Sequence, residues 1–144
     1  MTPTPTTHLA DDILMVVTRL ARRLRRVADD GITPTQRSIL NTLERRGSLT
    51  HGDLAAVERV KPPTITAAVD RLEADGLAVR ERDAVDRRVT RVSITDAGKS
   101  LLNAARRERT AYLEQRLRAL PAADRAAIGA AAPALARLLE DPHR

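Results

Sequence analysis

Charged residues between positions 80 and 88 form a group whose chemistry suits phosphate binding. Its members are Arg80, Arg82, Asp86, Arg87 and Arg88. A planar guanidinium pairs with phosphate oxygens and also suits a narrow DNA minor groove, where negative potential is concentrated. We predict Arg88 as the groove contact and the other arginines as phosphate contacts, with Asp86 holding a neighbouring arginine through charge-assisted hydrogen bonds. The alternative is an exposed loop whose charges serve only solubility.

Small polar residues upstream form a second group with related chemistry. Its members are Thr50, Pro63, Thr64, Thr66 and Arg71. Hydroxyls in the first turn of a helix can bond base edges or phosphates, and the unpaired backbone amides there favour an anion. Thr64 fits a helix cap as well as it fits a DNA contact. Arg71 fits an exposed position without a partner as well as a phosphate contact. The two groups together predict a surface that binds nucleic acid.

The overall charge indicates a polyanionic partner. The chain of 144 residues has 25 basic and 19 acidic side chains, a formal net charge of +6 and a pI near 11.0. A small protein of such high pI is attracted to nucleic acids. Tyr112 is the only aromatic residue. The base stacking that holds single strands is therefore not expected, and double-stranded DNA is the predicted partner.

The same composition argues against an enzyme, a cofactor site and a metal site. The chain has no cysteine, and its histidines, His8, His51 and His143, are far apart in the sequence. It has no glycine-rich phosphate loop, nucleophile elbow or convincing Ser/His/Asp set. No apolar run approaches the ~18 residues of a membrane span, and the first residues lack an apolar signal core. We expect a cytoplasmic protein that is not an enzyme and has no membrane partner.

Periodicity predicts four helices before the charged group. The first, over 9–29, has one apolar stripe and an opposite face rich in arginine, which we interpret as solvated. The second begins with Thr33 as its N-cap and with Gln36 completing a capping box. The third and fourth helices follow Thr50 and Lys61. The residues expected inside are Ile39, Leu40, Leu43, Leu54, Ile65, Val69 and Leu72.

After Gly76 the apolar period changes from about four to two, which predicts a β-hairpin with strands over 77–82 and 91–94. Short capped helices followed by a hairpin are the plan of a winged helix-turn-helix. The predicted fold class is therefore mainly α with a small β-hairpin wing. We expect a single domain over 1–144, with a DNA-binding lobe over about 32–95.

The segments outside this lobe, 9–30 and 96–140, are predicted to be dimerisation helices. They carry more apolar surface than the lobe can cover, and a second copy of the chain would bury it. Because proline removes a backbone hydrogen bond and clashes with the preceding turn, Pro133 predicts a kink or break at 129–133. The predicted dimerisation residues are Ile13, Val17, Leu20, Tyr112, Leu117, Leu135 and Leu138.

Two segments carry a resemblance to a known family. The segment 86–98, Asp-Arg-Arg-Val-Thr-Arg-Val-Ser-Ile-Thr-Asp-Ala-Gly, is similar to the wing signature of the MarR-type (multiple antibiotic resistance regulator) transcription factors, with Ile94 where leucine is usual. The segment 63–77 is similar to the recognition helix of that family and the turn into its wing. The resemblance extends over 9–139. Members often carry a basic residue near Ala67, so this chain is expected to depend more on shape and phosphate contacts.

The resemblance implies a homodimeric transcription regulator, usually a repressor, whose recognition helices meet successive major grooves of a pseudo-palindromic operator. It also implies Arg88 as the groove contact and Asp86 as its organiser. A further implied partner is a small aromatic or anionic effector that binds between the lobe and the dimerisation helices and shifts the protein off DNA. With so few aromatic residues, its pocket would be built from Leu, Ala, Val and Arg. The alternative function is a winged-helix module that binds protein and has no sequence-specific affinity for DNA.

Overall fold

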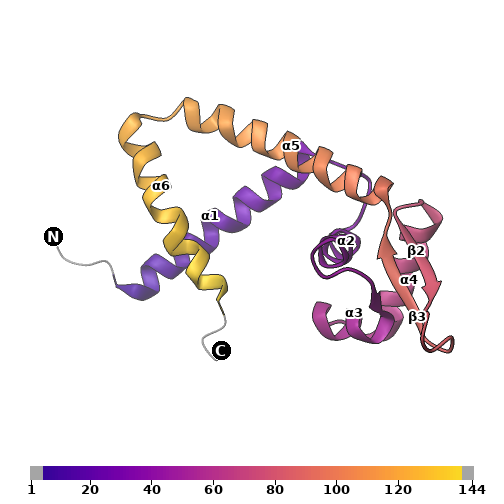
Figure 1. Cartoon of the computed structure of the whole chain (residues 1–144). Coiled ribbons are helices and arrows are strands. Elements are labelled where there is room, and N and C mark those ends of the chain that lie inside the picture. Colours follow the sequence, from indigo (N-terminus) through magenta and orange to yellow (C-terminus); the bar gives the residue numbers. More distant parts are fainter. Residues whose placement is uncertain (1–4, 141–144) are drawn as a thin grey trace. The chain divides into compact units, whose positions relative to one another are not determined.

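The computed structural model describes residues 5–140, and the chain divides into two compact units, Met1–Glu108 and Arg109–Arg144. The order of elements runs from indigo to yellow in Figure 1. It is α1 (Thr6–Val27), α2 (Pro34–Arg46), β1 (Leu49–Thr50), α3 (His51–Glu58), α4 (Pro62–Ala74), β2 (Ala78–Arg82), β3 (Thr90–Ile94), α5 (Asp96–Arg118), α6 (Ala122–Ala136) and a 3₁₀ helix (Arg137–Leu139). The predicted fold class, mainly helical with a small β-hairpin, is confirmed.

The starts of α2 and α3 are fixed by the capping residues that the sequence predicts. The backbone amide of Gln36 donates to Oγ1 of Thr33 at 3.2 Å, and the backbone amide of Thr33 donates to Oε1 of the Gln36 side chain at 2.8 Å. Thr50 and Asp53 form the same reciprocal pair at the start of α3. Each capping box satisfies backbone amides that the helix itself leaves unpaired. The short helices of the lobe therefore begin at defined residues.

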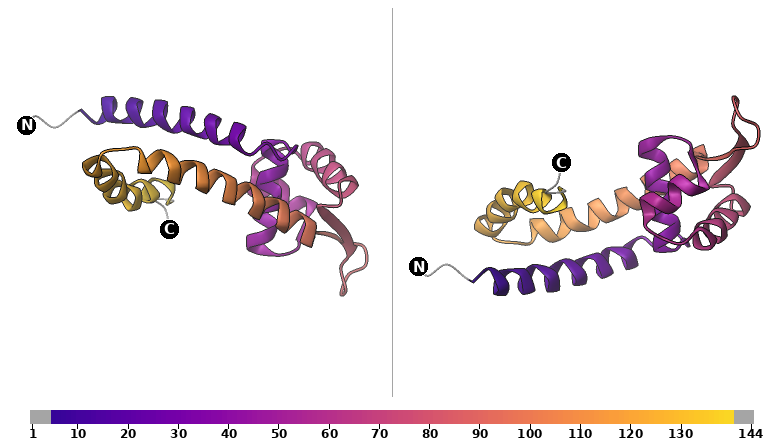
Figure 2. Two further views of the ribbon diagram at one scale, coloured as in Figure 1. Left: turned by 90° about the horizontal axis from the view of Figure 1, so that it is seen from above. Right: turned by 90° about the horizontal axis from the view of Figure 1, so that it is seen from below.

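The strands form one antiparallel sheet in the order β1-β3-β2. Val92 of β3 pairs with Leu49 of β1 on one side and with Arg80 of β2 on the other. β1 was not expected from the sequence, because two residues are too few to show an alternating pattern. The loop between β2 and β3 projects from the helices of the lobe as a wing (Figure 2).

The core of the first unit lies between α2, α3, α4 and the hairpin. The residues that the sequence predicts as interior are confirmed, since each is at most 1% exposed. The rest of this cluster comes from the hairpin and α5: Leu77, Ala78, Val92 and Leu102. Burying a side chain of this size contributes about 1.5–3 kcal/mol. The apolar face of each short helix therefore holds that helix against its neighbours.

The start of α5 is packed against the hairpin through Gly98 and Thr95. Oγ1 of Thr95 donates to the Gly76 carbonyl oxygen at 2.6 Å and accepts from the Gly98 amide at 3.1 Å. A Cβ atom placed on Gly98 would lie 2.3 Å from the Leu77 carbonyl oxygen and 2.7 Å from Cγ1 of Ile94. The first turn of α5 can approach the hairpin this closely only because residue 98 has no side chain.

The link between α1 and α2 is held by an ion pair. Both terminal nitrogens of Arg37 donate to the carboxylate of Asp30, whose side chain is only 8% exposed. Burial raises the pKa of Asp30, but the hydrogen bonds and charge of Arg37 outweigh it and hold that pKa below its usual value. Gly31 follows at φ +72°, a conformation that glycine adopts without strain. The chain therefore leaves α1 through a fixed turn.

α6 corrects one prediction from the sequence. The helix runs without interruption from Ala122 to Ala136 with Pro133 inside it, so a break at 129–133 is wrong. Alanine is the strongest helix former, and nine of the fifteen residues of α6 are alanine. Their propensity offsets the backbone hydrogen bond that Pro133 cannot donate. The regular helix ends three residues later, where the 3₁₀ helix follows.

Candidate nucleic-acid interface

The wing loop is organised by Asp83, which stands just after β2. Its Oδ1 accepts from the amides of Val85 and Asp86 at 2.8 and 3.1 Å, and its Oδ2 accepts from Nε of Arg91 at 2.5 Å. The Asp83 amide donates to the Val89 carbonyl oxygen at 2.8 Å and closes the loop. The hydrogen bond from Arg91, followed by those from the two amides, lowers the pKa of Asp83 to about 2. An ionised Asp83 therefore fixes the shape of this loop.

The role of Asp83 was not expected from the sequence, although a signal for it was present. An aspartate that accepts hydrogen bonds from amides two and three residues further on is a common turn former. An aspartate directly after a strand could have been interpreted in this way. Its second partner, Arg91, could not have been found from local spacing, because that pairing depends on the register of the hairpin.

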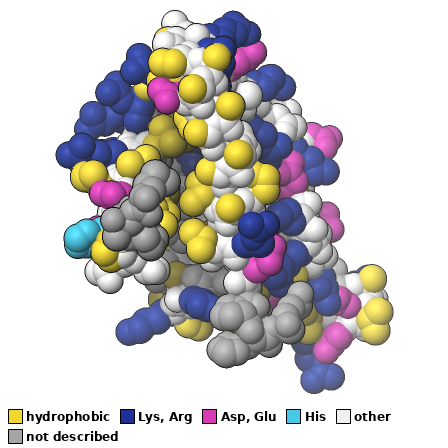
Figure 3. Space-filling model, turned by 90° about the vertical axis from the view of Figure 1, so that its left-hand side faces the viewer, with side chains coloured by type: hydrophobic (Ala, Val, Ile, Leu, Met, Phe, Trp, Pro, Cys, Tyr) yellow, Lys and Arg dark blue, Asp and Glu magenta, His cyan; other side chains and the backbone are white. Residues whose placement is uncertain are grey.

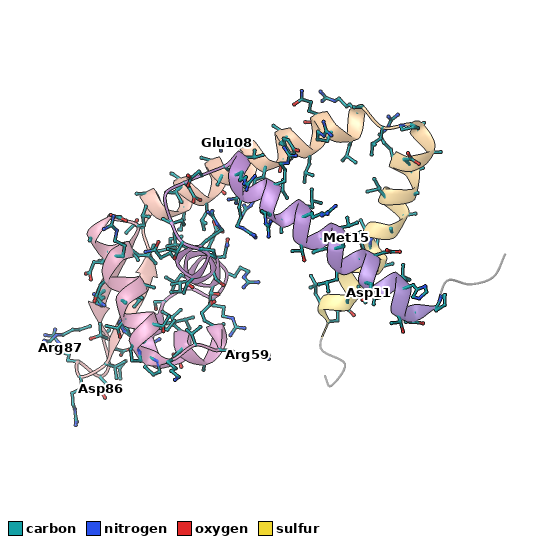
Figure 4. The ribbon with its side chains drawn as sticks, turned by 180° about the vertical axis from the view of Figure 1, so that it is seen from behind. Asp11, Met15, Arg59, Asp86, Arg87 and Glu108 are labelled. Carbon is teal, nitrogen blue, oxygen red and sulfur yellow. The ribbon has the colours of Figure 1, made fainter. Side chains whose placement is uncertain are left out.

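The tip of the wing presents the predicted arginines to solvent. The Arg88 amide donates to Oδ1 of Asp86 at 3.0 Å, and Nε of Arg88 lies 3.7 Å from the same oxygen. The Arg88 side chain is nevertheless 95% exposed. Figure 4 shows Arg87 extending away from the tip, beside Asp86. Arg82 is exposed at the end of β2. The two aspartates thus hold the loop while the guanidinium groups remain accessible.

Arg80 is differently placed, because its guanidinium contacts acidic groups of the same chain. It donates to Oδ1 of Asp70 at 2.5 Å and to Oε2 of Glu73, both on α4. Its Nη2 also lies 3.3 Å from Nε2 of His51 at the start of α3. Burial and then the charge of Arg80 lower the pKa of His51. We call Arg80, Asp70, Glu73 and His51 the Arg80 cluster; it joins α3, α4 and β2.

The predicted residues on α4 lie on its exposed side. Ile65, Val69 and Leu72 are buried, whereas Pro63, Thr64 and Thr66 are exposed. The N-cap of α4 is Lys61, which makes no side-chain capping bond, so the interpretation of Thr64 as the cap is wrong. The reason is that Pro62 and Pro63 start the helix three residues earlier than a cap at Thr64 would, since proline suits the first helical positions.

Two further predicted contacts already have partners within the chain. Nε of Arg71 donates to Oδ2 of Asp75 at 3.1 Å, in an ion pair on the helix surface. Oγ1 of Thr50 accepts from the Asp53 amide at 3.1 Å as the cap of α3. The structure thus brings Arg82, Asp86, Arg87 and Arg88 together on the wing and Pro63, Thr64, Thr66 and Arg71 together on α4.

The predicted dimerisation residues lie on α1, α5, α6 and the 3₁₀ helix. Only α5 among these has buried residues, three in number. Val17 and Leu20 of α1 and Leu135 of α6 are more than two-fifths exposed, and Leu138 is 69% exposed. Ile13, Tyr112 and Leu117 are half-buried. The exposed apolar surface of α1 is wider than the predicted stripe. It also includes Leu9, Leu14, Met15 and Val16.

Figure 3 shows apolar side chains in yellow, open at the surface on one face of the molecule. In α1 the run from Ile13 to Val17 is apolar at every position, and five consecutive residues go once around a helix. Figure 4 shows Met15 extending from one side of α1. α1 is therefore apolar all round at this point, as helices inside a protein assembly are.

A cavity of about 270 Å³ lies in the first unit beside the link between α1 and α2. It is lined by Ala28, Asp29, Asp30, Leu101, Ala104, Ala105 and Glu108. Alanine and leucine are among the residues expected around an effector. The charged lining residues, however, are carboxylates, where arginine was expected.

Residues 5–140 offer no membrane span and no candidate metal site. In this described part, none of the helices is both long and apolar enough to cross a membrane. The same residues contain no group of three or more His, Cys, Asp or Glu side chains that could hold a metal ion. His143 lies outside the described residues.

Comparison with known protein families places the lobe among transcriptional regulators. A family model described as the MarR family matches residues 32–90. An uncharacterised HTH-type transcriptional regulator of Mycobacterium leprae is 38% identical over 135 residues, which cover 93% of this chain and 94% of that protein. The HTH-type transcriptional repressor MdtR of Bacillus subtilis is 39% identical over 75 residues, or 52% of this chain and 48% of that protein.

Solved structures agree over almost the whole chain. A putative transcriptional regulator of Pseudomonas aeruginosa has a TM-score of 0.85 and 34% identity, covering 96% of this chain and 99% of that one. A point mutant of MepR from S. aureus, solved bound to an oligodeoxyribonucleotide, has a TM-score of 0.71 at 20% identity, with 95% of this chain and 99% of that one covered. At this identity the second likeness concerns the fold alone.

Proposed function

Because the chain belongs to the MarR family of DNA-binding transcriptional regulators, we propose that it acts as a homodimeric repressor on a pseudo-palindromic operator. Each copy inserts α4 into a major groove and lays its wing along the adjacent minor groove. The two half-sites are then centred about 34–36 Å apart, one turn of the double helix. Members of the family are regulators, so the prediction that the chain is not an enzyme is confirmed.

One observation carries the proposal: the same lobe presents the ordered wing loop, with its exposed Arg88, and the exposed side of α4. Because Asp83 already fixes the wing through three hydrogen bonds from Val85, Asp86 and Arg91, the loop loses little conformational entropy when it meets DNA. The Arg88 side chain is 95% exposed, and only its weak ion pair with Asp86 would have to break when Arg88 binds DNA. The net charge of +6 attracts the protein to DNA over longer distances.

Exposed apolar surface on the terminal helices supports the dimer. Leu14 and Val16 are 67% and 57% exposed on α1, and apolar area in water costs about 25 cal/mol per Å². A second copy of the same helices would cover this surface by twofold symmetry, the commonest arrangement of soluble oligomers. Of the predicted dimerisation residues, Val17, Leu20, Leu135 and Leu138 are exposed, whereas Ile13, Tyr112 and Leu117 are half-buried.

Repression released by an effector is the remaining part of the proposal. A relative named as a repressor matches part of the chain. The cavity beside Asp30 and Glu108 provides space for a small molecule near the Asp30–Arg37 ion pair, which holds the link between α1 and α2. Its carboxylates favour a neutral or cationic effector over the anionic one that the resemblance implies. The proposal places the protein in the cytoplasm with the chromosome.

The proposal is tested with the purified full chain and duplex DNA selected by it from a random pool. The logarithm of affinity should fall linearly with the logarithm of salt concentration, with a slope of about −0.9 per neutralised phosphate. Arg88→Ala should weaken binding by about 1–3 kcal/mol if its guanidinium occupies a groove. Arg116→Ala, which removes an exposed arginine of α5 outside the lobe, serves as the charge-matched control.

Two results would count against the proposal. If no duplex is enriched and binding does not depend on salt, the chain is a winged-helix module for a protein partner, which a pull-down would then identify. If Arg88→Ala and Arg116→Ala bind the selected duplex equally well, the wing has no part in recognition.

A further inference from the structure

The outward face of α4 carries short side chains that end in methyl or methylene groups. Ile65, Val69 and Leu72 face the core. The exposed residues of the first half of the helix are Pro62, Pro63, Thr64, Thr66 and Ala67. None of them is longer than threonine, and none carries an amide, a guanidinium or an ammonium group.

The charged side chains further along α4 already have partners. Asp70 and Glu73 accept hydrogen bonds from Arg80. Arg71 pairs with Asp75, four residues towards the C-terminal end, whereas a recognition helix contacts bases mainly with its N-terminal residues. The Thr66 hydroxyl donates to the Pro62 carbonyl oxygen at 3.2 Å, and because the Thr66 side chain is exposed, its methyl group stays available for an apolar contact.

These contacts eliminate most of the known ways in which a helix distinguishes base pairs. Guanine is read by Arg or Lys and adenine by Asn or Gln, and the first half of α4 has none of these. Cytosine can be read by a carboxylate, but Asp70 and Glu73 are occupied by Arg80. A threonine hydroxyl such as that of Thr64 can bond more than one base and so selects none by itself, which leaves apolar contact between Ala or Thr methyl groups and the C5-methyl group of thymine as the selective pairing.

We propose that α4 recognises its half-site through thymine C5-methyl groups, which contact the methyl groups of Thr64, Thr66 and Ala67. The inference rests on the proposed function, since it requires α4 in a major groove. The preferred half-site therefore contains thymine where the first two turns of α4 meet the bases. Because 5-methylcytosine carries its methyl group at the same place in the groove, it can replace thymine in these contacts.

Replacing single thymidines by deoxyuridine tests the inference, because the two nucleotides differ only by this methyl group. The duplex is one selected by the full chain from a random pool, labelled with a fluorophore and titrated by anisotropy at fixed salt. Each contacted methyl group that is removed should weaken binding about fourfold, as expected for one buried carbon. Deoxyuridine in the flanks of the same duplex is the control and should change nothing.

Protein variants then connect each methyl group to a residue. Thr64→Ser and Thr66→Ser keep the hydroxyl and remove only the methyl group, and both positions are exposed, so the fold is retained. With each variant, the fourfold loss at one thymine position should disappear, and deoxyuridine and thymidine should bind alike there. For the parent protein, a duplex with 5-methyldeoxycytidine paired with guanine at that position regains the methyl group. It should recover part of the affinity that deoxyuridine loses there.

The outcomes separate this inference from the function on which it rests. If no duplex is enriched from the pool, the proposed function fails. If a duplex is enriched but deoxyuridine at every half-site position leaves the affinity unchanged, the protein binds DNA and methyl recognition is refuted. A loss with deoxyuridine that Thr64→Ser and Thr66→Ser do not alter also refutes the assignment to these residues.

Discussion

Replacing Gly98 with alanine should destabilise the lobe, although alanine normally stabilises a helix. The new Cβ would lie 2.3 Å from the Leu77 carbonyl oxygen, so backbone would have to move. That carbonyl accepts a hydrogen bond from the Thr95 amide at 3.1 Å, and the bond would weaken with the movement. Overpacking costs about 1–3 kcal/mol, and a weakened hydrogen bond costs about 1 kcal/mol. The gain in helix propensity returns about 1 kcal/mol, which leaves a net loss of about 1–3 kcal/mol.

Gly52→Ala is the matched control. Gly52 lies in the first turn of α3, and a Cβ there would meet only Oγ1 of Thr50 at 3.8 Å, an ordinary contact. The same chemical change should therefore stabilise the protein by up to about 1 kcal/mol. Urea unfolding followed by circular dichroism gives both free energies. The measurements need one fixed protein concentration, because self-association raises apparent stability.

The result that would refute this reasoning is a Gly98→Ala protein as stable as the parent or more so. It would mean that the first turn of α5 can move away from the hairpin without loss. The contacts of Thr95 with Gly76 and Gly98 would then contribute little to holding α5 on the lobe.

The remaining predictions concern the wing, the Arg80 cluster and the terminal helices. Arg80→Ala should weaken operator binding by up to about fivefold, because it releases β2 from α4 and an exposed ion pair contributes about 0–1 kcal/mol. The slope of affinity against salt should stay unchanged in Arg80→Ala, whereas Arg87→Ala should reduce that slope by about 1. A reduced slope with Arg80→Ala would instead identify Arg80 as the phosphate contact that the sequence predicts. The pKa of Asp83 is lowered from 3.8 to about 2, so the stabilisation of the wing by Asp83 should be complete above pH 4 and lost as the pH falls through 2. The NMR shift of the Asp83 carboxyl carbon should follow this titration, and a midpoint near pH 3.8 would contradict the prediction. Val17→Glu should convert the proposed dimer to monomer in analytical ultracentrifugation, because it places a charge on the exposed apolar side of α1. A sedimentation coefficient equal to that of a dimeric parent would remove this part of α1 from the interface.

Local signals in the sequence predicted the lobe well. Thr33 and Gln36 form the predicted capping box, and Ile65, Val69 and Leu72 form the buried side of α4. These features depend on neighbouring residues, whose geometry in a helix is known in advance. The assignment of the chain to a winged-helix fold followed from the order of such elements.

Features that depend on contacts between distant residues were not predictable. Arg80 was assigned to phosphate because its partners Asp70 and Glu73 lie on another element, and only the fold brings them together. The role of Asp83 depends in part on Arg91 across the hairpin. Of the kink or break expected at 129–133, the break was wrong because the helix propensity of the neighbouring alanines outweighed a single proline.

The Arg80 cluster has a consequence for the kinds of change that an operator would tolerate. By joining β2 to α3 and α4, it restrains the base of the wing from moving independently of α4. An added base pair between the two contacted grooves lengthens the duplex by about 3.4 Å and rotates it by about a tenth of a turn. A lobe of fixed internal geometry cannot follow that displacement. Single-base exchanges should therefore be graded in effect, whereas insertions or deletions within a half-site should abolish recognition.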